Sequence, residues 1–311
     1  MTATTSRHRP ARPTVGIDMG GTTIRGGLVD PDGTVRRFVR RPVPRDAAGR
    51  RAAPADLARE LAGATVSGAA AVGLAVSGVV EGGRLVRSAN VGIAGVDLRA
   101  DLVAATGLPV EVVNDAQAAA LAEVRTGGAG TRGVVLVVTV GTGIGGALVV
   151  DGALVRGRGF AGEVGHTVVD RGGRPCGCGA AGCWEGLASG EALRREAERL
   201  LPGPRRTVDE LVERAGAGDV AAFAAVTACA EAFAEGLDSL CAVLAPDRVV
   251  LGGGVLARGG LVADLYRSTA LRRRWVRGAH VTTATWGDCG GLVGAGLVAH
   301  DAVRDAVPAR A

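Results

Sequence analysis

Three cysteines and one histidine lie close together in a glycine-rich stretch, and their side chains could hold a metal ion. His166, Cys176, Cys178 and Cys183 fall within eighteen residues, and thiolate sulfur with imidazole nitrogen is a usual donor set for structural zinc. Packing alone gives no reason to gather half of the six cysteines into eight residues. Because four protein donors leave no position for a catalytic water, we predict a structural zinc ion. The alternative is three ordinary cysteines and a surface histidine.

Glycines and two carboxylates surround this predicted metal site. Tight turns between the cysteines need residues without a side chain, and we assign this role to Gly177, Gly179 and Gly182. Glu163 and Glu185 flank the cluster, and zinc needs neither of them as a ligand. We infer that the metal braces the loop that carries these two carboxylates.

Three further glycine segments have the composition of phosphate- and nucleotide-binding loops. Segments 18–22 (DMGGT), 139–146 (TVGTGIGG) and 252–254 (GGG) each follow an apolar strand pattern, where backbone amides can approach a phosphate directly. A single Gly-Gly turn is more often a hairpin, but two such loops could grip one polyphosphate from both sides. The third loop offers a close approach for an adenosine. The chain has no lysine, which excludes a lysine-dependent phosphate loop.

Asn114 and Asp115 stand where the predicted strand 110–113 runs into an alanine-rich helix over 116–125. Both residue types are favoured at helix N-caps, so capping is one interpretation of the pair. A carboxylate at this junction could instead accept a proton during phosphoryl transfer. The two residues by themselves leave both interpretations open.

Hydrophobic patterning indicates the elements that must position these residues. A series of strand, glycine turn, strand and Asp-Gly turn occurs at 15–35 and again at 134–155, which predicts two related halves facing each other across a cleft. A length of 311 residues also favours two lobes. The other predicted strands are 70–76, 110–113, 247–254 and 279–285. The predicted helices are 54–63, 97–106, 116–125, 189–201, 207–215, 219–244, 260–271 and a closing helix from about 290.

Composition limits the class of protein. A net charge of +5 could suggest nucleic acid, but the arginines are scattered, which is typical of a solvated surface. No uninterrupted apolar run approaches the length of a membrane span, and the first thirteen residues lack the apolar region of a secretory signal. We expect a cytoplasmic protein whose thiols stay reduced. Cys229, Cys241 and Cys289 are expected to be small buried apolar residues.

The order of these motifs resembles the repressor, open reading frame, kinase (ROK) family of sugar kinases. The resemblance covers about 14–306 and includes DMGGT, SGVVEGG, NDAQAAALAE, TVGTGIGG, GEVGH, CGCGAAGCWE and LGGG. It implies an α/β, two-lobed actin-like ATPase (ribonuclease H-like) fold of the hexokinase/actin superfamily with a central cleft. The implied lobes are 14–115 with a helix at about 290–306, and 116–289 with the zinc-binding loop.

The resemblance also implies an activity: ATP-dependent phosphorylation of a hexose, with glucose converted to glucose 6-phosphate. Asp115 would be the general base for the 6-hydroxyl, and Asp18 would orient water around Mg²⁺. His166 would offer one ring nitrogen to the sugar and the other to zinc. The implied sugar-binding residues are Asn90, Asn114, Asp115, Glu163, His166 and Glu185. The implied ATP-binding residues are Asp18, Gly20, Gly21, Thr22, Thr142, Gly143, Gly253 and Gly254, and the zinc ligands are His166, Cys176, Cys178 and Cys183.

Three departures from the family pattern leave the sugar open. Thr23 stands where lysine is frequent, Ser77-Gly78 replaces Pro-Gly, and Asn90 begins Asn-Val-Gly-Ile in place of Asn-Leu-Gly-Trp. Another hexose or an N-acetylhexosamine such as N-acetylmannosamine is therefore an alternative substrate. Polyphosphate is an alternative donor within the family the chain resembles, but members that use it tend to lack the zinc cluster.

Non-enzymatic alternatives are weaker. A sugar-responsive repressor would need a helix-turn-helix before the first strand, and about thirteen residues are too few. A sugar-binding protein without activity is disfavoured because Asp115 and both phosphate loops are present. The implied partners are a hexose, ATP and further copies of the chain in a dimer or tetramer, with neither nucleic acid nor membrane.

Overall fold

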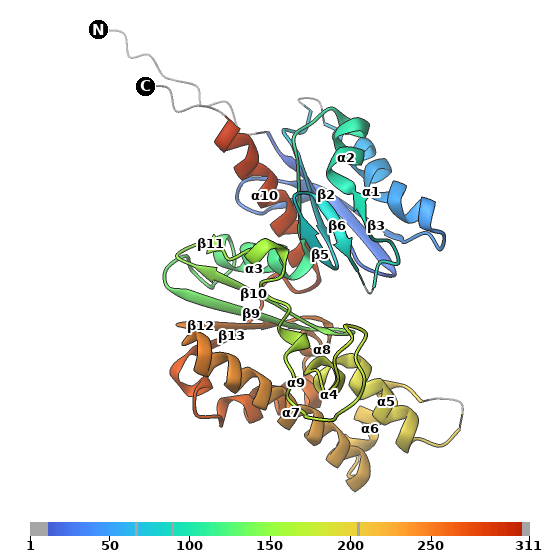
Figure 1. Ribbon diagram of the computed structural model, residues 1–311, viewed down its shortest axis with the longest axis vertical. Coiled ribbons are helices and arrows are strands. Elements are labelled where there is room, and N and C mark those ends of the chain that lie inside the picture. Colours follow the sequence, from blue (N-terminus) through green and yellow to red (C-terminus); the bar gives the residue numbers. More distant parts are fainter. Residues whose placement is uncertain (1–11, 66–67, 89, 204–205, 307–311) are drawn as a thin grey trace. The chain divides into compact units, whose positions relative to one another are not determined.

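The computed structural model describes residues 12–65, 68–88, 90–203 and 206–306 (Figure 1). Contacts divide the chain into two compact units. The first comprises the described residues up to Ala118 together with those from Gly291, and the second comprises Ala119–Gly290. The chain therefore leaves the first unit inside one helix and returns to it inside another.

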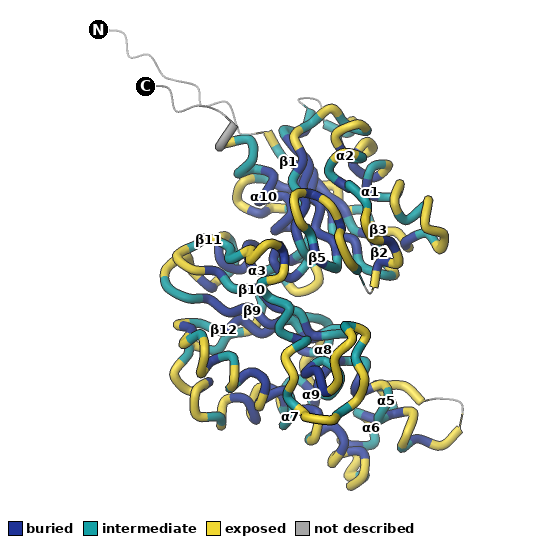
Figure 2. Tube along the Cα trace, in the orientation of Figure 1, coloured by how far each residue is buried: buried dark blue, intermediate teal, exposed yellow. Residues whose placement is uncertain are grey.

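The first unit is built on a five-stranded sheet with the order β3-β2-β1-β4-β8. β1, β2 and β3 form antiparallel hairpins, whereas β4 and β8 run parallel to β1. β1 (Figure 2) and β4 are almost completely buried, as expected of central parallel strands covered on both faces. The strands are β1 (Thr14–Met19), β2 (Thr23–Val29), β3 (Val35–Pro42), β4 (Val72–Val76) and β8 (Val110–Asn114).

A small sheet in the first unit occupies a region between residues 76 and 98 where no strands were predicted. It consists of β5 (Val79–Glu81), β6 (Arg84–Arg87) and β7 (Val96–Asp97). Gly82 and Gly83 both have positive φ and make the turn between the first two strands. Strands of two to four residues are too short to show a clear alternation of apolar and polar residues.

Four helices complete the first unit: α1 (Ala47–Ala62), α2 (Leu98–Thr106), the start of α3 (Asp115–Arg125) and nearly all of α10 (Gly290–Ala306). The predicted start of α1 at 54 is wrong. The side chain of Asp46 accepts a bond from the amide of Gly49 and caps the helix, which then continues through Pro54. The predicted boundaries of α2, α3 and α10 are confirmed to within a residue.

α10 lies against the sheet and α3 with its backbone in close contact. A Cβ on Gly73 would collide with the carbonyl of Ala295, and a Cβ on Gly294 would collide with the carbonyl of Ala118. Glycine at these positions allows the backbones to approach. α10 is thereby fixed to the first unit although it is the last helix of the chain.

The second unit repeats the same sheet. Its order is β11-β10-β9-β12-β13, with two antiparallel pairings followed by two parallel ones, as in the first unit. The prediction of two related halves is therefore confirmed in strand order and direction. The strands are β9 (Val134–Val140), β10 (Ile144–Val150), β11 (Ala153–Leu154), β12 (Arg248–Gly252) and β13 (His280–Thr283).

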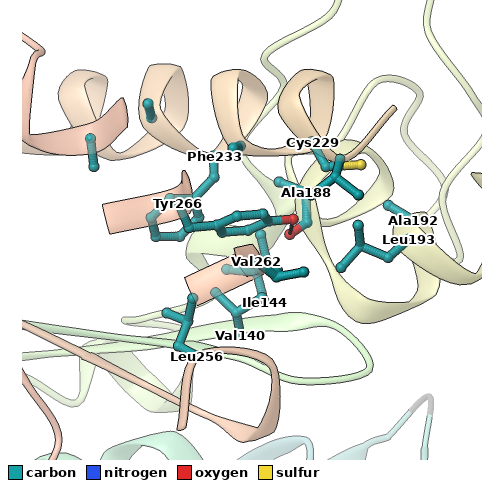
Figure 3. Close-up of a cluster of buried hydrophobic side chains, with 14 of the residues drawn as sticks. Val140, Ile144, Ala188, Ala192, Leu193, Cys229, Phe233, Leu256, Val262 and Tyr266 are labelled. Atoms are coloured by element: carbon teal, nitrogen blue, oxygen red, sulfur yellow. Dashed lines mark hydrogen bonds between the residues drawn. The ribbon is translucent and has the colours of Figure 1, made fainter. Parts of the chain in front are cut away.

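Helices of the second unit enclose an aromatic core. Phe233 of α7 packs between Trp184 and Tyr266, with ring centroids 5.4 and 5.1 Å apart, and the Tyr266 hydroxyl donates to the carbonyl of Ala188 (3.0 Å; Figure 3). The helices are α4 (Glu185–Ala188), α5 (Gly190–Leu200), α6 (Val208–Gly216), α7 (Val220–Leu244), α8 (Gly254–Ala257) and α9 (Gly260–Leu271). Short 3₁₀ turns are 157–159, 164–166, 276–278 and 287–289.

α7 is long and apolar enough, by length and composition, to cross a membrane, and it is the one such helix in the described part of the chain. Half of its apolar window is buried within the protein, and ten of its residues are buried. Eight of these ten residues belong to the hydrophobic core of the second unit. The hydropathy of α7 is therefore accounted for by its place in that core.

Candidate functional site

Asn114 and Asp115 lie at the end of β8, where α3 begins. The Asn114 side-chain oxygen accepts bonds from the amides of Ala116 (2.9 Å) and Gln117 (3.1 Å), and its side-chain nitrogen donates to the carbonyl of Gly78 (3.0 Å). The capping interpretation is thus correct for Asn114. Asp115 follows as the first residue of the helix.

The Asp115 carboxyl is half-buried and has few hydrogen-bond donors. It accepts bonds from the Ala116 amide (2.9 Å) and from the Ser77 hydroxyl. Burial raises the pKa of Asp115, and these bonds oppose the rise only in part. A carboxyl group whose pKa is raised toward the working pH is suited to accept a proton as a general base.

Asn90 lies between the first glycine loop and Ser77. Its side-chain nitrogen donates to the Ser77 hydroxyl (3.3 Å). A Cβ on Gly21 would lie only 2.5 Å from the Asn90 carbonyl oxygen, so this contact requires glycine. The structure therefore brings together Gly21, Asn90 and Asp115, three predicted site residues from distant parts of the chain.

Asp18, at the end of β1, faces the first turn of α10. A Cβ on Gly291 would lie 2.8 Å from the Asp18 carboxyl carbon, so glycine makes room for this carboxylate. Arg25 forms an ion pair with it (3.2 Å); the sequence analysis missed Arg25. The Gly20 amide donates to the Thr23 carbonyl (3.0 Å) and closes the turn, which leaves Thr22 exposed.

The second and third glycine loops are in contact within the second unit. The amides of Gly190 and Glu191, at the start of α5, donate to the carbonyls of Gly141 (2.8 Å) and Thr142 (3.1 Å). Gly253 has a φ of +87°, and a Cβ there would lie 2.5 Å from the Val140 carbonyl oxygen. The predicted phosphate-binding and adenosine-binding loops of this unit are thus in close backbone contact.

The donor atoms of His166, Cys176, Cys178 and Cys183 all lie within 4.8 Å of one another. Cys176 Sγ is 3.5 Å from His166 Nδ1, and Cys178 Sγ is 3.6 Å from Cys183 Sγ. Zinc–sulfur bonds of about 2.3 Å at a tetrahedral centre hold two sulfurs about 3.8 Å apart. The cluster therefore fits a zinc ion in both donor chemistry and spacing.

The backbone around the cluster depends on two of the three predicted glycines. Gly179 and Gly182 have φ values of +98° and +76°, and a Cβ on Gly182 would collide with the carbonyl of Asp170. Gly177 has no left-handed backbone and no atom within 4 Å of an added Cβ, so the role assigned to it is wrong. Burial raises the pKa of Cys183 to about 12, and a bound metal would displace this proton.

Glu163 and Glu185 lie beside the His166 ring of the cluster. His166 Nδ1 is 3.6 Å from Glu185 and faces Cys176, whereas Nε2 is 3.7 Å from Glu163. The two ring nitrogens therefore face different partners. Glu185 also accepts a bond from the Ile144 amide (3.4 Å), and a Cβ on Gly143 would lie 2.5 Å from its carboxylate. Glu185 thus joins the cluster to the second glycine loop.

Comparison with known proteins places the chain in a family. Residues 14–302 match the ROK family over most of the chain. The protein belongs to the ROK family. It is 34% identical to a glucokinase of Streptomyces coelicolor, over 93% of this chain and 98% of the relative. It is also 34% identical to an N-acetylmannosamine kinase of Citrobacter koseri, over 92% and 98% of the two chains.

A solved ROK structure supports the fold and the activity class. A ROK glucokinase from Streptomyces griseus, in complex with glucose and AMPPNP, has a TM-score of 0.81 and 33% identity, with 93% of this chain and 99% of that chain covered. The present chain therefore has the two-domain, actin-like ATPase fold of these enzymes, and it is a sugar kinase.

Within this ROK kinase, Trp184 is a positioning residue that the sequence analysis missed. It is fully buried, its ring nitrogen donates to the Ala232 carbonyl (3.0 Å) and its amide to the Thr167 carbonyl (2.8 Å). Because Trp184 stands between Cys183 and Glu185, it anchors a cluster residue and a carboxylate at once. A large aromatic residue between them, in a chain with three tryptophans, was the available signal.

The predicted sugar-binding residues divide between the two units. Asn90, Asn114 and Asp115 belong to the first unit, and Glu163, His166 and Glu185 to the second. Within each unit the members are neighbours, linked by the contacts given above.

Proposed function

We propose that this ROK kinase transfers the γ-phosphate of ATP to the 6-hydroxyl of glucose. The main support is the state of Asp115, a half-buried carboxyl at the start of α3 whose burial raises its pKa. Further support comes from glucokinase relatives at 34% identity and from the related structure with glucose and AMPPNP.

In this proposal Asp115 accepts the proton of the sugar hydroxyl as its oxygen bonds to the γ-phosphorus and the bond to ADP breaks. Phosphoryl transfer depends mainly on positioning and charge stabilisation, so a single carboxylate base suffices. Asn90 would hold a neighbouring hydroxyl. Asn114 donates one amide hydrogen to Gly78, and its second would serve the sugar.

The second unit would contribute Glu163, His166 and Glu185 as further partners of the sugar hydroxyls. We propose a structural zinc ion held by His166 Nδ1 and the three cysteines, which leaves His166 Nε2 for the sugar. Zinc would supply rigidity to the loop that carries these residues. Support comes from the donor spacing and from the separate directions of the two ring nitrogens.

Nucleotide binding would rest on the three glycine loops. Gly20, Gly21, Thr22, Thr142 and Gly143 would contact the phosphates, and Gly253 and Gly254 the adenosine. Asp18 would orient the water shell of Mg²⁺, a cation that binds proteins through carboxylates and keeps several waters. Its ion pair with Arg25 (3.2 Å) would hold the carboxylate in position for this role.

An N-acetylmannosamine kinase is the second candidate, because a relative with that activity is equally identical to this chain. A coupled assay of ADP release with ATP and glucose, mannose, N-acetylglucosamine or N-acetylmannosamine separates the two. The highest kcat/KM on glucose supports the proposal. A kcat/KM at least about tenfold higher on N-acetylmannosamine than on glucose would instead identify an N-acetylmannosamine kinase. Turnover with none of these sugars would overturn both.

We further propose a cytoplasmic location and assembly as a dimer or tetramer. The six cysteines are free thiols, which suits a reducing compartment. Light scattering on the purified protein measures the number of subunits.

A further inference from the structure

We propose that Ser77 is a positioning residue whose hydroxyl links Asn90 to Asp115 and fixes the orientation of the Asp115 carboxylate. The inference rests on the proposed function, in which Asp115 is the base. Ser77 itself would touch neither the sugar nor ATP.

The fold brings these residues together at the ends of two neighbouring strands. β4 and β8 are parallel, and Val76 is paired with Asn114, so Ser77 and Asp115 are the next residues along each strand. The Ser77 amide donates to the Met19 carbonyl (3.3 Å), and the Ser77 carbonyl accepts from the Ser88 hydroxyl (2.7 Å). The backbone of Ser77 is therefore held from two sides.

The direction of the hydrogen bonds follows from the chemistry of the groups. The Asn90 side-chain nitrogen carries hydrogens and can only donate, so the Ser77 oxygen accepts this bond (3.3 Å). A carboxylate can only accept, so the single hydroxyl hydrogen of Ser77 is donated to Asp115. Successive bonds in one direction polarise one another and strengthen the link to the carboxylate.

The hydroxyl opposes the effect of burial on Asp115. Burial raises the pKa of this carboxyl, while the Ser77 hydroxyl and the amides of Ala116 and Asp115 lower it. Within the described part of the chain, no charged side chain on the neighbouring elements adds to these influences. Ser77 is therefore the one side chain among these donors, and the others are backbone amides that a substitution cannot remove.

The test is the pH dependence of kcat for Ser77→Ala. Without the hydroxyl, the charged form of Asp115 loses a donor, so the acidic limb of the profile should move to higher pH by about one unit. Ser77→Thr retains a hydroxyl and should restore the wild-type limb. Ser239→Ala is the matched control, because that hydroxyl donates to a backbone carbonyl of α7 (3.0 Å); its profile should match the wild type.

Two results would overturn the inference. One is an acidic limb in Ser77→Ala that coincides with the wild type. The other is a rise in sugar KM alone, which would mean that Ser77 acts on Asn90 and not on the base. Ser77→Cys, similar in volume but a weak donor, should give a smaller shift in the same direction and serves if the alanine variant is unstable.

A second readout does not depend on turnover. The aspartate carboxyl groups are labelled with carbon-13 and followed by NMR, and the resonance that is missing from Asp115→Asn identifies Asp115. The pKa obtained from its chemical shift should be higher in Ser77→Ala than in the wild type. An unchanged titration contradicts the role of Ser77 even if kcat falls. Full kcat in Asp115→Asn would instead reject the proposed function, so the two failures are distinguishable.

Discussion

Asp115 combines burial with a charge that the proposed chemistry needs. Burial disfavours the carboxylate, and the donors from Ala116 and Ser77 only partly offset this. Ionising a poorly solvated carboxyl costs folding free energy, which is a frequent property of functional groups. Substitution of Asp115 by asparagine should therefore change both the rate of catalysis and the stability of the fold.

Asp115→Asn should lower kcat by about 10²- to 10⁴-fold, because an amide of nearly the same shape cannot accept the hydroxyl proton. Sugar affinity, measured by calorimetry, should change little, since Asn114 and Asn90 are untouched. Full kcat of the variant on every accepted sugar would remove Asp115 from the base role.

Asp115→Asn should also raise thermal stability at about pH 8. Because the folded pKa lies above the ordinary value of 3.8, the folded state binds more protons than the unfolded state between the two values. The contribution of the protonated Asp115 carboxyl to stability is therefore present at low pH, and it is lost as the pH rises through the folded pKa. The gain in melting temperature should shrink on acidification. Asp32→Asn is the control, because a bond from Thr34 lowers the pKa of that exposed carboxyl, so no gain is expected.

At the scale of elements, the segment from the end of β11 to the first residue of α4 carries both the cluster and the two carboxylates, Glu163 and Glu185. Two structural facts support a bracing role for a metal: Trp184 anchors only the end of the loop, and Glu185 contacts both Cys176 (3.6 Å) and the second glycine loop. Loss of the cluster should therefore disturb the sugar-binding carboxylates.

Cys178→Ser should lower zinc content below one ion per chain and weaken sugar binding, because serine replaces a thiolate donor. Elemental analysis and calorimetry give the two quantities. Cys289→Ser, a half-buried thiol outside the cluster, should retain both. Wild-type protein stripped of metal that binds sugar with unchanged affinity would contradict the bracing role.

At the scale of the whole molecule, the chain builds the same five-stranded sheet twice and closes the first unit with its last helix. The first unit is therefore discontinuous in sequence. Its integrity depends on the close approach of α10 to α3 and to the sheet, which the glycines at the contact permit.

Gly294→Ala should destabilise the protein by about 1–3 kcal/mol, because the added methyl meets the backbone carbonyl of Ala118 and forces the helices apart. Gly216→Ala is the matched control: it lies at the end of α6 with no atom near an added Cβ, so its stability should be equal or slightly higher. Urea unfolding measures both, and equal midpoints for the two variants would show that α10 tolerates displacement.

The sequence determined the features that depend on neighbours along the chain. The strand–glycine turn–strand series, most helix and strand positions and the grouping of His166 with three cysteines could all be predicted, because periodicity, turn residues and ligand spacing are local properties. The repeated series even predicted the duplication of the sheet. The start of α1 was missed because the Asp46 cap is a single residue, and β5–β7 because they are too short to show a pattern.

Only the tertiary structure decided which side chains meet. Ser77 and Asp115 become neighbours because β4 and β8 are adjacent and parallel, a strand order that hydrophobic patterning does not encode. Likewise, Asn114 caps α3 while Asp115 does not, and Glu185 reaches the second glycine loop. Such contacts depend on how strands pair and helices pack over long separations, where many arrangements satisfy the same local pattern and only the complete core selects one.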